Sequence, residues 1–183
     1  MCPYQTIPFQ WSIHYVDDHG GMTHFEYLAD GADDPRRELA ERLLEALPEA
    51  DTPILAYNAT FEKGVILDLA RSIEGLSDQL EALVPRLRDP LPIIRSHTYF
   101  REYKGSFSLK AVGPALVPEV DYVGLEGISD GLTASITFER LIAGELNEGE
   151  TPEDIRRQLF QYCELDTLAM VGLHKSLLKL AGL

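Results

Sequence analysis

The chain of 183 residues has the length of a single globular domain, and its 45% hydrophobic residues are enough to bury a substantial core. With 30 acidic and 16 basic residues the formal net charge is −14, which would repel a phosphate backbone unless the few cations gather on one face. The charge therefore argues against a general nucleic-acid binder. It argues less against an enzyme that uses carboxylates to hold metal ions.

The sequence shows no segment for a membrane or for export. No apolar run reaches the about 18 to 20 residues that span a bilayer, and residues 1–5 lack the basic and apolar parts of a signal peptide. The two cysteines, Cys2 and Cys163, are too few for a disulfide framework, and both are expected to be free thiols in a reducing compartment. These features predict a cytoplasmic protein without membrane contact.

Hydrophobic patterning in the first part of the chain predicts an α/β protein. Residues 7–16 alternate apolar and polar side chains, and residues 23–28 follow after a turn with two glycines, which is typical of a β-hairpin. Asp34 as N-cap and Pro35 in the first turn suit a helix to about residue 47. Residues 53–57 then form a short apolar strand that leads into a helix over 61–72.

The rest of the chain is predicted to be mainly helical. Helices are expected over 77–84, 108–116 and 130–143, with a short strand over 91–96. The last element is the clearest, because Thr151 can cap a helix that Pro152 and two acids begin, and this helix should run, broken or continuous, to about residue 180. No repeat or linker divides the chain, so one domain over 1–183 is predicted.

Two short motifs carry candidate chemistry. On the last helix, Tyr162 and Asp166 are four residues apart and share one face, so the phenol can orient a water on a metal ion that the carboxylate binds. Glu62 follows the 53–57 strand, and sites in open α/β sheets form beyond the carboxyl ends of strands. Each motif also has a plainer explanation: a half-buried aromatic near a solvated acid, and an acid that favours the helix dipole.

The order of these motifs resembles a known enzyme family. Y-N-A-T-F-E at a strand-to-helix turn, followed on the last helix by Y-C-x-x-D-T, is similar to the second and third motifs of the DEDDy exonucleases, which have the ribonuclease H-like fold of DnaQ-like and B-family polymerase proofreading domains. Ser108-Leu109-Lys110 is similar to the S-L-K that opens a helix in these domains. The chain also resembles a bacterial domain family of unknown function whose members begin with an Asp-Phe-Glu strand followed by P-Y-Q-x-I-P-F-Q-W-S, a continuation that residues 3–12 match.

The resemblance implies an α/β, ribonuclease H-like mixed sheet flanked by helices, and it implies a reaction. Asp166 would be the third-motif metal ligand, Tyr162 would position the attacking water, and Glu62 would replace the second-motif aspartate with one extra methylene. Two Mg²⁺ or Mn²⁺ ions would support hydrolysis of a terminal phosphodiester of DNA or RNA. The substrate contacts implied are Asn58, Lys104, Ser106 and Lys110.

The sequence departs from these exonucleases at the first motif. DEDD sites need an Asp-x-Glu on the first core strand, and no D-x-E occurs in the 183 residues. The chain is therefore expected to be a fragment of a longer protein with other domains, to lack the first core strand, and to bind metal weakly or not at all. Because a missing central strand exposes backbone and apolar surface, the remaining strands should pair directly or a homo-oligomer should cover the gap.

Two other function classes stay open. A non-catalytic ribonuclease H-like module for nucleic-acid or protein binding fits the acidic charge and the missing motif. An unrelated small-molecule enzyme has less support, because no dinucleotide-binding, P-loop or nucleophile-elbow motif occurs. The five histidines show no metal-ligand spacing with the cysteines and are expected on the surface or in the core rather than on zinc: His14, His19, His24, His97 and His174.

Overall fold

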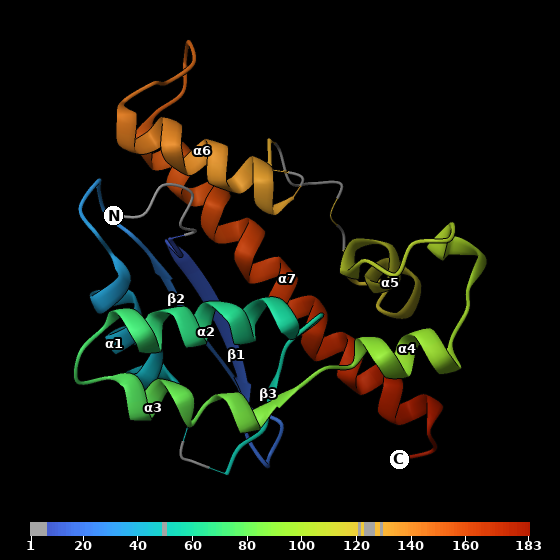
Figure 1. Cartoon of the computed structure of the whole chain (residues 1–183). Coiled ribbons are helices and arrows are strands. Elements are labelled where there is room, and N and C mark those ends of the chain that lie inside the picture. The colour runs from blue at the N-terminus through green and yellow to red at the C-terminus, as the bar shows by residue number, and fades with distance from the viewer. Residues whose placement is uncertain (1–6, 49–50, 121, 123–126, 129) are drawn as a thin grey trace.

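The computed structural model describes residues 7–48, 51–120, 122, 127–128 and 130–183, and within them it confirms a mixed α/β chain (Figure 1). Its described strands form two separate two-stranded sheets, β1 (Gln10–Val16) with β2 (Met22–Leu28) and β3 (Ile54–Leu55) with β4 (Leu87–Arg88). The first pair is antiparallel and the second is parallel. The helices are α1 (Arg36–Ala46), α2 (Thr60–Ser72), α3 (Ser77–Glu81), α4 (Leu91–His97), α5 (Leu109–Leu116), α6 (Gly131–Ala143) and α7 (Pro152–Leu180), with 3-10 turns at Val84–Arg86 and Arg101–Tyr103.

The predicted β-hairpin is confirmed, and its turn explains its register. The Asp17 carboxylate accepts the backbone N–H groups of His19 and Gly21 at 2.8 and 2.7 Å, and Gly20 adopts the left-handed φ of 80° that favours glycine. The resulting register pairs His14 with His24. Register decides which face each side chain occupies, because alternate residues of a strand point to opposite sides.

Both faces of β1 are covered, whereas four of the seven residues of β2 are exposed. On one face Trp11 and Tyr27 pack against the core formed by α1, α2 and α3, and Trp11 Nε1 donates a hydrogen bond to Leu39 O at 3.1 Å. The polar side chains of β1 lie on the other face, against α7, where Gln10 Nε2 donates to Leu159 O at 2.7 Å. The polar face of β1 is thus enclosed by a helix instead of open to water.

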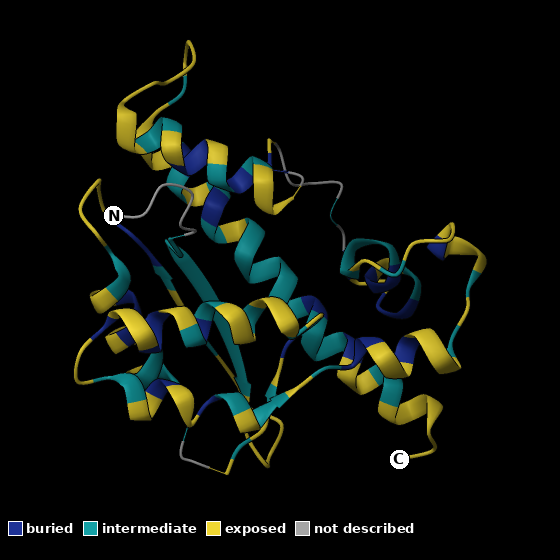
Figure 2. Ribbon diagram, viewed as in Figure 1, coloured by how far each residue is buried: buried dark blue, intermediate teal, exposed yellow. Residues whose placement is uncertain are grey.

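Helix α7 joins the two halves of the molecule. Its first half packs with α6 and the end of β2, and its second half packs with α5 and the residues that follow α5. Gly172 allows the second contact, because a Cβ at this position would overlap the side chain of Val117. The start of α7 is the predicted one, with a capping box between Thr151 and Asp154. Figure 2 shows its middle turns buried or half-buried and its last turn exposed.

The strand predicted over 91–96 is wrong, because this segment forms helix α4. Pro90 is the N-cap and Pro92 stands in the first turn, where a helix loses nothing from a missing N–H. The Asp89 carboxylate accepts the Leu91 N–H at 2.9 Å and completes the helix start. The parallel strand β4 comes immediately before, at Leu87–Arg88.

Other boundaries differ by a few residues. The strand predicted over 53–57 is limited to Ile54–Leu55, and the helix predicted over 77–84 ends at Glu81. Pro35, not Asp34, is the N-cap of α1, although the Asp34 carboxylate accepts the Arg36 N–H at 3.1 Å. The helices predicted over 61–72, 108–116 and 130–143 are confirmed to within one residue at either end.

Two sequence expectations concern the thiols and the membrane. Cys163 is a half-buried free thiol, whereas Cys2 and the first four residues of the 3–12 match lie outside the described residues. Across the described ranges, no helix combines the length and the apolar character that crossing a membrane requires.

Candidate functional site

Tyr162 and Asp166 lie together on α7, and Lys110 of α5 lies against them. Lys110 Nζ is 4.4 Å from the centroid of the Tyr162 ring and 5.6 Å from that of Tyr122, both within cation–π range. Burial raises the pKa of the Asp166 carboxyl, while Lys110 and the phenols of Tyr122 and Tyr162 act to lower it. We call these four residues the Lys110–Asp166 cluster.

The polar groups of this cluster are only partly satisfied. Asp166 Oδ1 and Tyr122 Oη are buried and make no hydrogen bond of good geometry within the described part of the chain, although both phenols lie close enough to Asp166 to affect its pKa. Burial, and next the Asp166 charge, raise the pKa of both phenols. Since a buried polar atom without a partner costs about 1–3 kcal/mol, the cluster can accept a further cation or water.

Glu62 lies in a second cluster, at the carboxyl edge of the parallel strands. It stands in the first turn of α2, directly after β3, and its Oε2 is buried without a hydrogen-bond partner among the described residues. Burial raises the pKa of Glu62, a backbone hydrogen bond opposes this, and the charge of Asp89 adds to it. Asp89 follows β4 and accepts the backbone N–H groups of Asn58 and Ala59, both at 3.1 Å.

The two clusters are linked by packing. Tyr57, which precedes the turn into α2, packs against the core shared by α5 and α7, and its hydroxyl donates to Phe107 O at 2.7 Å. Figure 1 shows the start of α2 directed toward the middle of α7. The charged neighbours nevertheless differ, since Glu62 is influenced by Asp89 and Asp166 by Lys110. A metal ion shared by Glu62 and Asp166 therefore stays a prediction.

The predicted substrate contacts fall into two places. Asn58 belongs to the Glu62 turn, where its backbone has a left-handed φ of 60°. Lys104 and Ser106 line an open hollow beside α5 together with Lys110. Ser106 Oγ also donates to Ser108 Oγ at 3.2 Å. In this strongly acidic chain the hollow brings one further lysine, Lys104, next to the Lys110–Asp166 cluster, together with the acidic Glu102.

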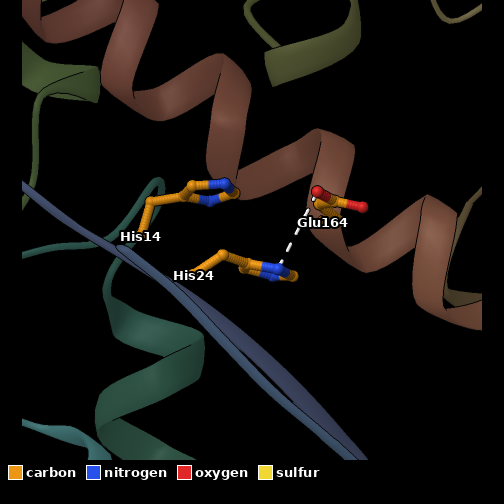
Figure 3. Close-up of side chains that lie close together, drawn as sticks. All are labelled: His14, His24 and Glu164. Atoms are coloured by element: carbon orange, nitrogen blue, oxygen red, sulfur yellow. Dashed lines mark ion pairs between the residues drawn. The ribbon is translucent and has the colours of Figure 1, made fainter. Parts of the chain in front are cut away.

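A third cluster was not expected from the sequence. The rings of His14 and His24 stack with centroids 4.5 Å apart and planes 18° apart, and Glu164 of α7 lies beside them (Figure 3). One ligand atom from each of the three lies within 4.8 Å of the others. The hairpin turn was the available signal, because strands that meet around residues 17–21 place position 14 opposite position 24. Glu164 had no such signal, since it comes from a distant helix.

Asp89 and Tyr122 were also missed. Asp89 gave no sign in the sequence, because the strand that precedes it, β4, was not predicted, and its role depends on the parallel pairing of β4 with β3. Tyr122 reaches the Lys110–Asp166 cluster from the segment after α5, which no periodicity predicted.

Comparisons with known proteins give one result. No curated protein and no solved structure matches the chain. The family match covers the hairpin, both parallel strands and the predicted residues Asn58, Glu62, Lys104 and Ser106, and it stops before Lys110 and the α7 residues. Residues 1–108, more than half of the chain, match a domain of unknown function (DUF2779), so the chain belongs to this family.

Proposed function

We propose that this domain supplies part of a DEDDy-type 3′–5′ exonuclease site that hydrolyses phosphodiesters of DNA or RNA. The observation that carries the proposal is the arrangement on α7, where Tyr162 and Asp166 share one face and Asp166 keeps a buried oxygen without a hydrogen bond. A carboxylate with a free buried oxygen fits a hard cation such as Mg²⁺ or Mn²⁺.

Each of these residues would have a separate role in the hydrolysis. Asp166 and Glu62 would hold the metal ions, which supply an activated water and stabilise the leaving oxygen. Tyr162 orients the water from one helical turn away. Lys110, with Lys104 in the adjoining hollow, provides positive charge for a terminal phosphate that an acidic chain would otherwise repel.

The arrangement of the strands also supports the proposal. A ribonuclease H-like sheet, as the sequence resemblance implies, has its first strand in the centre. Here no ladder among the described strands joins the antiparallel β1–β2 pair to the parallel β3–β4 pair. An additional strand with Asp-x-Glu, placed between these pairs, would bring the two carboxylates of the motif that does not occur in the 183 residues.

The test is to supply that strand. The chain is extended at its N-terminus by a segment carrying Asp-Phe-Glu, with a matched extension carrying Asn-Phe-Gln as control, and 5′-labelled DNA and RNA oligonucleotides are followed with Mn²⁺ on sequencing gels. We expect stepwise shortening from the 3′ end only with the acidic extension. Asp166→Asn and Tyr162→Phe in that chain should each slow it by about 10²-fold or more.

Two outcomes would count against the exonuclease. If the acidic extension stays inactive while circular dichroism shows a folded chain, the two-metal site is not formed. If Asp166→Asn retains full activity, hydrolysis has another source. Tight Mn²⁺ binding by the unextended chain that Glu62→Ala abolishes would overturn the expectation that this chain binds metal only weakly.

One observation favours a non-catalytic module as the second candidate. Lys110 already places a positive charge beside Asp166, so the carboxylate is partly neutralised without a metal ion. In this case the same oligonucleotides should bind to the chain without being shortened. Binding should then weaken on Lys110→Ala and Lys104→Ala but not on Glu62→Ala. The predicted homo-oligomer is checked with the same preparation by light scattering.

A further inference from the structure

The histidine cluster, His14, His24 and Glu164, sits on the face of the hairpin that α7 covers (Figure 3). His24 Nδ1 is 3.8 Å from Glu164 Oε1, and all three side chains are half-buried. Ser12 and Thr167 surround the rings: Thr167 Oγ1 contacts His14 Nδ1 at 2.8 Å, and Ser12 Oγ contacts His24 Nε2 at 2.9 Å.

One arrangement of protons satisfies all the hydrogen bonds around the rings at once. Thr167 Oγ1 lies 3.0 Å from Glu164 O, and because a carbonyl can only accept, the threonine hydroxyl donates there. His14 Nδ1 and Ser12 Oγ must then donate to Thr167 Oγ1, the latter over 2.8 Å. With its proton used, Ser12 Oγ accepts from His24 Nε2.

When both rings are neutral, this assignment leaves a lone pair on one nitrogen of each. His14 carries its proton on Nδ1, so Nε2 is bare, and His24 carries its proton on Nε2, so Nδ1 is bare and faces the Glu164 carboxylate. Burial, and next the neighbouring His24, lower the pKa of His14, while Glu164 acts to raise it, and the net lowering favours the neutral imidazole that metal binding requires. Fixing the tautomer by a hydrogen bond on the other nitrogen is how proteins prepare histidine ligands.

We infer that His14, His24 and Glu164 form a site for a divalent cation of the Zn²⁺ class. Two imidazoles and one carboxylate are a ligand set that zinc uses with water in the fourth position. Tetrahedral ligands at about 2.0–2.2 Å from zinc lie about 3.3–3.6 Å apart. Since the ligand atoms lie within 4.8 Å of one another, the longest separation must shorten by up to about 1.5 Å, and the stacked rings must turn so that both ring planes contain the ion.

The site is distinct from the exonuclease-like one. Glu164 and Asp166 are two residues apart on α7, so their side chains point about 200° apart around the helix axis. Asp166 faces Lys110 and the phenols, whereas Glu164 faces the hairpin, where Glu26 is the further charged neighbour. Nitrogen ligands favour zinc and its neighbours over Mg²⁺, so the two sites also differ in the ion they select.

The experiment is isothermal titration of the full chain with Zn²⁺ alone, repeated with Co²⁺ to read the coordination from its visible absorption. We expect one ion per chain. His14→Ala and Glu164→Gln should each weaken binding at least tenfold. His174→Ala is the matched control on an exposed turn of the same helix and should bind as the unchanged chain does. Asp166→Asn should also bind normally.

The outcomes separate this inference from the proposed function. If Zn²⁺ binds equally to the unchanged chain and to His14→Ala, or if it does not bind at about 100 μM, the assigned site is wrong. If Asp166→Asn abolishes binding while His14→Ala does not, zinc occupies the carboxylate site instead. Should a variant fail to fold, ¹⁵N spectra of the unchanged, metal-free chain decide: protons on His14 Nδ1 and His24 Nε2 support the site, and the opposite tautomers overturn it.

Discussion

The two sides of α7 solve the problem of half-buried polar groups differently. On the α5 side, Asp166 is set against a lysine and two phenols, and a carboxylate oxygen and a phenol oxygen are left without good hydrogen bonds. On the hairpin side, a continuous series of hydrogen bonds runs from Glu164 O through Thr167 and Ser12 to His24. On the α5 side, charge and burial determine the state of Asp166. On the hairpin side, the hydrogen bonds determine which ring nitrogens carry protons.

The difference indicates how each side would respond to a ligand. On the α5 side, the ligand atom would be a carboxylate oxygen of Asp166, whose negative charge is already stabilised by Lys110. A cation there must therefore compete with the lysine. The hairpin side presents ring nitrogens held by hydrogen bonds on their other ring nitrogens, so an ion there needs the stacked rings to turn but no charged partner to be displaced. Perturbing one side should therefore leave the other nearly unchanged.

The largest effect is expected from breaking the contact that holds α5 against α7. Gly172→Ala should destabilise the chain by about 1–3 kcal/mol, because the new methyl group overlaps the buried Val117. Alanine alone would favour a helix interior by about 1 kcal/mol. In a Val117→Ala background, Gly172→Ala should thus become neutral or stabilising in urea unfolding. An equal loss in both backgrounds would mean that α5 does not pack here.

An intermediate effect is expected on the hairpin side. Thr167→Val keeps the shape of the side chain but removes the oxygen that His14 and Ser12 share, at a cost of about 1–2 kcal/mol in the free energy of unfolding. Zn²⁺ affinity should fall about 10- to 100-fold, as for other supporting groups of metal ligands. Thr167→Ser is the control that keeps the hydroxyl. Unchanged zinc binding in Thr167→Val would contradict the assignment of the His14 and His24 tautomers through Thr167.

The smallest effect concerns the link between the Glu62 turn and the α5 side. Burial, and next Tyr103, raise the pKa of Tyr57 to about 12. Because the folded state holds this proton more tightly than the unfolded state does, the contribution to stability is full below pH 10, the ordinary pKa, and is lost as pH rises through about 12. Tyr57→Phe should cost about 0.5–1.5 kcal/mol, since the bond to Phe107 O is lost.

Absorbance at 295 nm follows the ionisation of the Tyr57 phenol, and urea unfolding measures the stability loss, with Tyr99→Phe as the control. Tyr99 is 73% exposed, so Tyr99→Phe should change stability little. A titration in which Tyr57→Phe removes a phenol that ionises near pH 10 would contradict the buried environment of Tyr57.

Local patterns in the sequence were sufficient for most elements and for one pair of site residues. Alternation predicted the hairpin, apolar spacing predicted α6, capping residues predicted the start of α7, and four-residue spacing put Tyr162 beside Asp166. These features depend on neighbours within one element. The strand predicted over 91–96 was wrong because Pro90 and Pro92 suit a helix start as well as a strand boundary. The hydrogen bond from Leu91 N–H to Asp89 favours the helix, and the sequence did not reveal it.

The parts that could not be predicted involve contacts between distant segments. Glu164 meets His24 across 140 positions because α7 covers the polar face of β1, and a single sequence holds no record of that contact. Lys110 was proposed as a phosphate contact, yet it also lies on the Tyr162 ring and beside Asp166. Both facts follow from where α7 packs, which hydrophobic periodicity alone does not determine.

The carboxylate of Asp89 has a further consequence for local unfolding. It accepts hydrogen bonds from the backbone N–H groups of Asn58 and Ala59 before α2 and of Leu91 at the start of α4. One side chain therefore stabilises two strand-to-helix junctions. The ladder between β3 and β4 spans only two residues on each strand. Without Asp89 both junctions would lose their shared acceptor at once. Because the two junctions share this acceptor in the unchanged chain, α2 and α4 should open together in hydrogen exchange as one cooperative unit, although 18 residues of sequence separate them.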